Sequence, residues 1–181
     1  MTDINIENIV ASAQVSGSFD VEMLSEKMPG SSYNPDEFDG LTIKFESPKT
    51  AVLVLGSGKL ICTGAKNQNE VDTSMKNAIV KIESAGFKVK KTFKTDIENI
   101  VASTDLNKQI DLEDASKGLI IQNVIYDPKD FPGLIYKADL YGSILILFSS
   151  GKIVCTGAKK LEDATKAIDM LKDKLTSIGV L

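Results

Sequence analysis

Short apolar stretches rich in β-branched residues run through the chain and are interrupted by turn residues. Three of them follow one another at residues 38–45, 50–55 and 59–63. Pro48 separates the first two, and Gly56-Ser57-Gly58, a sequence typical of a hairpin, separates the last two. These stretches predict β-strands joined by short turns.

Other segments carry apolar residues at helical spacing. Residues 20–28 place Val21, Leu24 and Met28 on one stripe, with Asp20 able to cap the helix, and a matching helix is predicted from Asp111. Two longer helices are predicted over residues 68–86 and 161–178, and Gly86 and Gly179 stand where each should end. Residues 87–95 predict one more strand. Strands without long crossovers favour antiparallel pairing and an α+β fold.

The chain repeats itself once. Residues 6–12 recur unchanged as residues 97–103, and residues 57–66 closely match residues 150–159. Between the segments 33–66 and 126–159, 14 of 34 positions are identical. The second copy has two extra residues between its first strand and its Tyr-x-Pro turn. Two copies of this length predict a pseudo-twofold molecule with domains at residues 1–93 and 94–181.

Both faces of the predicted sheet are apolar, although amphipathic helices can cover only one of them. Asn8, Asn99, Thr63 and Thr156 recur on the otherwise apolar second face. Packing of the two copies face to face is one explanation, but a dry interface would need a hydrogen-bond partner for each polar group. The minor groove of A·T-rich DNA also fits, because it presents acceptors between apolar sugar walls.

The amino-acid composition argues against catalytic and metal-binding functions. The 181 residues are 43% hydrophobic with a formal charge of −4, and the chain has no histidine, so it lacks the commonest general base and metal-binding nitrogen. Every basic residue is lysine. Cys62 and Cys155 are predicted to pack in the core, and Gly56-Ser57-Gly58-Lys59 lacks the remaining residues of a phosphate-binding loop. We therefore predict no enzyme, no cofactor and no metal site.

The doubled Ser-Gly-Lys-x-x-Cys-Thr-Gly-Ala-Lys, the Asn-Ile-Val strands and the Phe-x-Gly-Leu segments resemble the TATA-binding protein family over roughly residues 4–179. The short N-terminus and acidic charge are more similar to archaeal than to eukaryotic members. The resemblance implies a saddle, in which a curved ten-stranded antiparallel sheet binds the DNA minor groove and helices cover the convex face. It also implies a general transcription initiation factor that recognises the TATA-box promoter element and bends the DNA.

Matching positions imply roles for individual residues. Asn8, Asn99, Thr63 and Thr156 would hydrogen-bond the bases. The apolar floor would consist of Val10, Val101, Leu53, Ile61, Ile146 and Val154. Two wedge pairs, Phe38 with Leu55 and Phe131 with Phe148, would enter the end base steps, although the family usually has phenylalanine where this chain has Leu55. Phosphate contacts would come from Lys44, Lys59, Lys66, Lys137, Lys152 and Lys159.

The resemblance further implies a protein partner. The loop at residues 126–130 corresponds to the family's contact with the transcription factor B-type initiation factor, and Asp127 keeps its acidic character. RNA polymerase would join indirectly, and the bare apolar face favours a homodimer in the absence of DNA. A polar start and short apolar runs predict a cytoplasmic, nucleoid-associated protein, or a nuclear one in a eukaryote, with no membrane contact.

Two other functions are compatible with a curved apolar sheet. One is an intracellular carrier that holds a hydrophobic ligand. The other is a TATA-binding-like grip domain of a repair enzyme or nuclease, which would lack paired wedges. A comparison of binding to TATA and GC duplexes separates promoter recognition from both.

Overall fold

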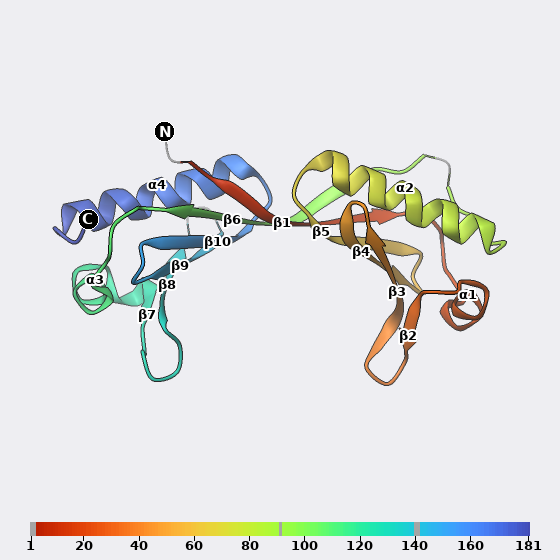
Figure 1. Ribbon diagram of the computed structural model, residues 1–181, viewed down its shortest axis with the longest axis horizontal. Coiled ribbons are helices and arrows are strands. Elements are labelled where there is room, and N and C mark those ends of the chain that lie inside the picture. The colour runs from red at the N-terminus through yellow and green to blue at the C-terminus, as the bar shows by residue number, and fades with distance from the viewer. Residues whose placement is uncertain (1–2, 91, 140–141) are drawn as a thin grey trace. The chain divides into compact units, whose positions relative to one another are not determined.

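The protein is described by a computed structural model covering residues 3–90, 92–139 and 142–181. The chain forms two compact units, one made of Asn8–Glu98 and the other of Met1–Glu7 with Asn99–Leu181 (Figure 1). Each unit therefore contains most of one sequence repeat and the first residues of the other repeat's leading strand. All ten strands belong to one sheet, and the pairs within each unit are antiparallel.

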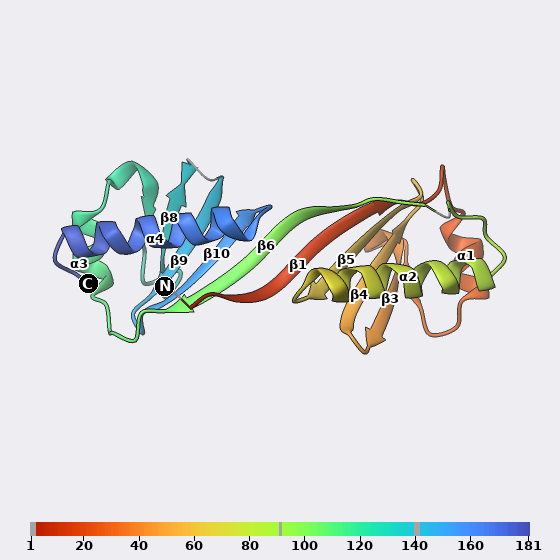
Figure 2. The same ribbon diagram turned by 90° about the horizontal axis from the view of Figure 1, so that it is seen from above.

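The unit of the first repeat contains five strands and two helices. In chain order they are β1 (Asn5–Gln14), α1 (Val21–Lys27), β2 (Ser32–Asn34), β3 (Phe38–Glu46), β4 (Lys49–Leu55), β5 (Lys59–Ala65) and α2 (Gln68–Ser84). The strands lie in the order β2-β3-β4-β5-β1. Helix α2 lies along one face of this sheet, against β4 and β5 (Figure 2).

The unit of the second repeat has the same order of strands and long helices. It contains β6 (Thr95–Asp105), α3 (Leu112–Gly118), the 3-10 helix η1 (Ile121–Asn123), β7 (Val124–Ile125), β8 (Gly133–Ala138), β9 (Ser143–Phe148), β10 (Lys152–Ala158) and α4 (Leu161–Ser177). Its strands lie in the order β6-β10-β9-β8-β7, and α4 packs against β9 and β10. The α+β class and the antiparallel sheet predicted from the sequence are confirmed.

The residues predicted to cap or end the helices occupy those positions in the structure. Asp20 caps α1 by accepting a hydrogen bond of 2.9 Å from the Met23 N–H, and Asp111 caps α3 in the same way. Gly86 and Gly179 follow the C-termini of α2 and α4 with φ values of 89° and 76°, which favour glycine over any residue with a Cβ. The four predicted helices are therefore confirmed, and their bounds differ from the prediction by one or two residues.

The predicted strand at residues 87–95 is wrong. No strand occurs in the described part of residues 87–94, and β6 begins at Thr95. The segment does expose alternate side chains, which produced the strand-like pattern. However, the Lys90 N–H donates to the carbonyl of Val15, at 2.7 Å, and Val15 lies just beyond the end of β1. Apolar side chains anchor it instead, since Phe87 packs edge-on against Phe19 with ring centroids 6.3 Å apart.

The core of each unit lies between its sheet and its helices. On the helix-facing side of β4 and β5, Val52, Val54, Leu60 and Cys62 are fully buried. Leu145, Leu147, Ile153 and Cys155 are equally buried in the second unit. Both cysteines are thus core residues, as predicted, and burial raises the pKa of both thiols.

Candidate nucleic-acid interface

Each unit leaves one face of its sheet without helices; we call it the open face. The residues that alternate with the buried core, such as Leu53 and Ile61 in the first unit and Ile146 and Val154 in the second, are partly exposed. Val10 and Val101 on the leading strands are also partly exposed. All six residues predicted for the apolar floor therefore lie on an open face, and their contact with DNA stays a prediction.

A polar cluster of Asn8, Thr63 and Gly64 interrupts the apolar surface in the first unit. The Gly64 N–H donates a hydrogen bond of 2.6 Å to Asn8 Oδ1, and Asn8 Nδ2 donates one of 3.2 Å to Thr63 Oγ1. Because a backbone N–H can only donate, this contact fixes which end of the amide is oxygen. The amide nitrogen and the hydroxyl are left facing each other.

The second unit builds the same cluster from Asn99, Thr156 and Gly157. Here the Gly157 N–H donates to Asn99 Oδ1 at 2.7 Å, and Asn99 Nδ2 donates to Thr156 Oγ1 at 3.0 Å. The structure therefore brings together the asparagine and threonine predicted as a pair in each repeat. Their role as base contacts stays a prediction.

Sequence reasoning missed the glycine in each cluster. The pairing of β1 with β5 shifts between Ile9 and Ala11, so that β5 holds one extra residue there, and β10 has the same bulge opposite β6. Gly64 and Gly157 adopt φ values of 93° and 96° within these bulges. The doubled Thr-Gly-Ala was the available clue, because a glycine inside a strand often marks a bulge.

Each cluster has hydrogen atoms left to donate. An asparagine amide has two N–H donors, of which one contacts the threonine. The amide oxygen accepts from the glycine N–H and also lies within 3.5 Å of the Thr63 hydroxyl and 3.4 Å of the Thr156 hydroxyl. Each open face therefore presents an amide N–H donor beside a hydroxyl, within an apolar surround.

The predicted wedge residues come together at the far strands of each unit. Phe131 and Phe148 pack edge to face with centroids 6.1 Å apart at 62°, and Phe131 is 37% exposed. Phe38 is 44% exposed, and Leu55, which occupies the position of Phe148, lies on β4 opposite Gly40. Apolar side chains are thus grouped at the surface of each unit, which makes these pairs candidates for contact with another molecule.

A glycine supports each wedge pair. A Cβ on Gly40 would lie 2.3 Å from Phe38 Cε1 and 3.1 Å from Leu55 Cδ2. A Cβ on Gly133 would lie 2.7 Å from Phe131 Cε1 and 3.3 Å from Phe148 Cε1. The rings thus rest directly on the backbone, and any larger residue there would displace them. These two glycines belong to the candidate site, although the sequence showed them only as part of Phe-x-Gly-Leu.

The six candidate phosphate contacts are surface lysines. Lys44, Lys66, Lys137, Lys152 and Lys159 are exposed. Lys59 is partly buried, and its Nζ lies 3.6 Å from Glu98 Oε1. The same Glu98 oxygen accepts a hydrogen bond of 2.6 Å from the Ser12 hydroxyl. The sequence analysis missed this carboxylate, which lies next to a predicted phosphate contact.

Asp127 lies in an exposed turn that leads into the wedge residue Phe131. Its carboxylate accepts a hydrogen bond of 3.0 Å from the Lys129 N–H, and its carbonyl accepts bonds from Asp130 and Phe131. Asp127 therefore shapes the turn that positions the ring. Its contact with a partner stays a prediction.

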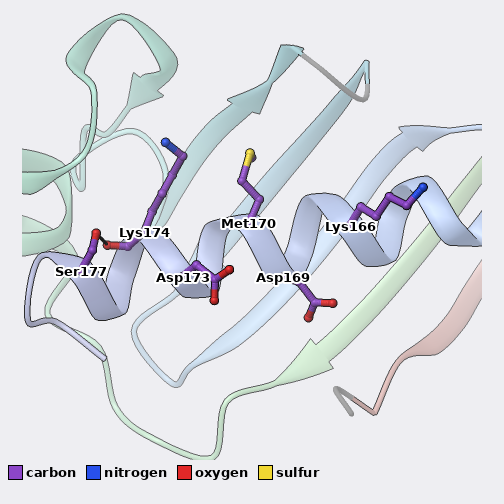
Figure 3. A pocket seen from close by; sticks show the side chains of 6 residues that line it. All are labelled: Lys166, Asp169, Met170, Asp173, Lys174 and Ser177. Atoms are coloured by element: carbon purple, nitrogen blue, oxygen red, sulfur yellow. Dashed lines mark hydrogen bonds between the residues drawn. The ribbon is translucent and has the colours of Figure 1, made fainter.

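A hollow of about 530 Å³ lies on α4, away from the open face of its own unit. It is lined by Lys166, Asp169, Met170, Asp173, Lys174 and Ser177, whose side chains do not converge on one point (Figure 3). Lysines and aspartates in this mixture are typical of a solvated helix surface. Within the described residues, no helix is long and apolar enough to span a membrane.

Comparisons with known proteins agree with this geometry. Residues 3–85 and 94–178 match the family described as Transcription factor TFIID (or TATA-binding protein, TBP). The TATA-box-binding protein of Methanothermobacter thermautotrophicus is 41% identical over 179 residues, covering 99% of this chain and 98% of the relative. TATA-box-binding protein 1 of Methanosarcina acetivorans is 38% identical over 180 residues, with coverage of 99% and 98%.

A solved structure gives the same result. The structure of Methanococcus jannaschii TBP has a TM-score of 0.87 and 34% sequence identity, and the match covers 97% of this chain and 99% of the other. The family match extends over both repeats and most of the chain. The chain belongs to the TATA-binding protein family.

Proposed function

We propose that the protein is a general transcription initiation factor that binds the TATA-box element through the minor groove and bends the DNA. Relatives of nearly equal length are named TATA-box-binding proteins. The observation that carries the proposal is the pair of Asn–Thr–Gly clusters on open faces, each accompanied by an exposed apolar wedge pair. This is a binding function and requires no catalytic group.

The polar clusters suit the chemistry of A·T base pairs. The minor groove of such pairs presents adenine N3 and thymine O2, which are both acceptors. Asn8 with Thr63, and Asn99 with Thr156, supply donors for these acceptors. The floor residues around them contact the sugar walls and lose exposed area on binding, which is favourable by about 25 cal/mol per Å².

The wedge pairs suit a kinked duplex, as is known for the family. Inserting an apolar side chain between base steps costs a few kcal/mol per step. TA steps unstack most easily, so part of the sequence preference is elastic energy. We assign Phe131 with Phe148 to one end of the site, and Phe38 with Leu55 to the other.

Lysines and a protein partner complete the proposal. Lys44, Lys59, Lys66, Lys137, Lys152 and Lys159 would position the DNA through its phosphates without reading its sequence. The Asp127 turn would contact a transcription factor B-type initiation factor, and RNA polymerase would join through that factor. The domain boundary at residues 93/94 stays part of this proposal.

Fluorescence anisotropy tests the function. We expect the protein to bind a labelled TATA duplex at least 1,000-fold more tightly than a GC duplex of the same length, the lower end of specificity ratios seen for DNA-binding proteins. Repeating the titration at two salt concentrations separates phosphate contacts from base contacts, since only the former scale with salt. Equal affinity for the two duplexes would contradict promoter recognition.

A further inference from the structure

A lysine-rich segment joins α2 to β6 in the first unit. It consists of residues 87–90 and 92–94, and we call it the lysine strap. It leaves the C-terminal end of α2 and runs back past the helix to β6 (Figure 2). Its second half lies beside the start of α2, because residues 92–95 line a common hollow with Gln68 and Lys76. None of its residues was assigned to the DNA interface.

Two contacts attach the first half of the strap to the unit. The Phe87 ring packs edge-on against Phe19, with ring centroids 6.3 Å apart. Three residues further along, the Lys90 N–H donates a hydrogen bond of 2.7 Å to the Val15 carbonyl. Because both ends of residues 87–90 are attached, this part of the strap follows a defined path over the unit.

Three lysines gather around Phe87 on this half of the strap. Phe87 and Val89 are half-buried, whereas Lys88 and Lys90 are exposed, so alternation along the segment turns both lysines outward. Lys27 of α1 joins them, because its Nζ lies 5.7 Å from the centroid of the Phe87 ring. An aromatic ring attracts a cation without neutralising its charge. We call Lys27, Lys88 and Lys90 the basic patch.

The basic patch keeps its charge. Among the residues that the structure describes, no ion pair involves any of its three lysines. The second half of the strap differs, since Lys94 Nζ lies 2.7 Å from a carboxylate oxygen of Asp96. The patch therefore concentrates positive charge on a chain whose net charge is −4, and such a local concentration attracts a polyanion.

The residue types of the strap favour a phosphate backbone over a protein surface. Protein interfaces are depleted in lysine and enriched in aromatic residues, whereas lysine commonly neutralises nucleic-acid phosphates. The large apolar side chains of the described strap are not among the exposed ones of the protein. The strap thus offers charge without an apolar anchor, which suits DNA better than a folded partner or a lipid surface.

We propose that the basic patch binds the sugar-phosphate backbone of a second DNA segment, without reading its sequence, while the open faces hold the promoter. This inference rests on the proposed function, which places the protein on DNA. The patch is built from α1 and the strap, and it shares no residue with the predicted DNA interface. Contacts of this kind are weak and depend strongly on salt.

Fluorescence anisotropy with a second duplex tests the proposal. The full chain is saturated with an unlabelled TATA duplex, and a labelled GC duplex is then titrated into the complex. We expect a dissociation constant of about 10⁻⁴ M or lower at 50 mM salt. For three phosphate contacts, this affinity should fall roughly 40-fold between 50 and 200 mM salt.

A pair of double variants separates the patch from the charge of the whole protein. Lys88→Gln with Lys90→Gln should weaken binding of the second duplex about tenfold or more and flatten its salt dependence to that of about one contact. Lys160→Gln with Lys166→Gln removes the same charge from exposed positions in the second unit and should leave this binding unchanged. Both variants should bind the TATA duplex as the parent does.

Lysine labelling locates the contact directly. A brief treatment of the TATA complex with an N-hydroxysuccinimide ester, followed by mass spectrometry, reports how accessible each lysine is. The second duplex should protect Lys88 and Lys90 and leave Lys160 and Lys166 reactive. Labelling of Lys88 and Lys90 that does not change would show that the second duplex binds elsewhere and would overturn the proposal.

Other outcomes would also overturn it. One is no binding of the GC duplex to the TATA complex at about 10⁻⁴ M and 50 mM salt. Another is an equal loss in the two double variants, which would assign the effect to net charge. Tighter binding of single-stranded RNA, a polyglutamate peptide or anionic vesicles would assign the patch to that partner. Because TATA affinity is measured separately for each variant, failure here leaves the proposed promoter binding unaffected.

Discussion

The two wedge pairs differ, although the strands that carry them are equivalent. In the second unit, Phe131 and Phe148 support each other edge to face above Gly133. In the first unit, Phe38 lies beside Leu55 above Gly40, and among the described residues no aromatic ring pairs with it. An aromatic pair contributes about 0.5–1.5 kcal/mol beyond its buried area. The second unit thus holds its wedge in a better defined arrangement.

The lysines that open β5 and β10 differ in the same sense. Lys59 shares the Glu98 carboxylate with Ser12, whereas Lys152 forms no ion pair within the described residues. In the proposed complex, both differences would make the second unit the stronger grip on DNA. A chain with two similar but unequal repeats would therefore distinguish the two ends of its site.

The bulge glycines give the largest expected effect. Gly157→Ala places a Cβ 2.7 Å from the Gly142 carbonyl oxygen at a φ of 96°, and should lower the free energy of unfolding by about 2–4 kcal/mol. Gly64→Ala should cost less, because its Cβ would lie 3.0 Å from the Lys49 oxygen. Urea unfolding of both variants measures the difference. Equal stability to the parent would mean that the bulge is easily remodelled.

Removing one asparagine should weaken DNA binding without unfolding the chain. Asn99→Ala removes a donor toward the bases and should cost about 1–3 kcal/mol of TATA affinity. Asn8→Ala is the matched change in the first unit. Anisotropy gives the affinities, and circular dichroism checks the fold. An unchanged affinity of Asn99→Ala would show that this amide does not face the bases.

Exchanging wedge residues tests the comparison directly. Phe148→Leu gives the second unit the side chains of the first, and should cost about 0.5–1.5 kcal/mol of binding and reduce the bend. Leu55→Phe should change both in the opposite direction. Energy transfer between dyes at the ends of an asymmetric TATA duplex reports bend and orientation. If Leu55→Phe leaves the orientation preference intact, the wedges do not set it.

Removing the ion pair between Lys59 and Glu98 should have the smallest effect on DNA binding. Glu98→Gln removes the half-exposed carboxylate beside Lys59 and should strengthen DNA binding by at most about 1 kcal/mol. The dependence of affinity on salt should steepen, because one more lysine becomes available to a phosphate. Glu113→Gln, which breaks the pair with Lys117 on α3, is the control and should change neither quantity.

The sequence predicted the features that depend on local pattern. Alternation along β4 and β5 separated the core residues from Leu53, Ile61 and Thr63, and the repeat paired Asn8 with Thr63 and Asn99 with Thr156. Asp20 and Gly86 marked helix ends because capping and positive φ depend on neighbouring residues. The four helices and the longer strands were predictable for these reasons, whereas the short strands β2 and β7 were not.

The remaining features depend on contacts between distant segments. The alternating pattern of residues 87–95 gave no information on whether another strand could pair with this segment, and no strand forms in its described residues before Thr95. The link from Ser12 through Glu98 to Lys59 joins residues far apart in sequence. The bulges at Gly64 and Gly157 arise from the register of two strands, which alternation within one strand does not reveal.

The hydrogen bond from the Gly64 N–H to Asn8 Oδ1, and its counterpart at Gly157, have a consequence for guanine. An asparagine that is free to rotate can turn its oxygen toward a guanine N2 amino group. Here a backbone N–H holds each oxygen on the glycine side, so turning the oxygen toward that amino group would break this hydrogen bond. In the proposed complex this cost would count against a G·C pair at each cluster before the DNA is bent at all.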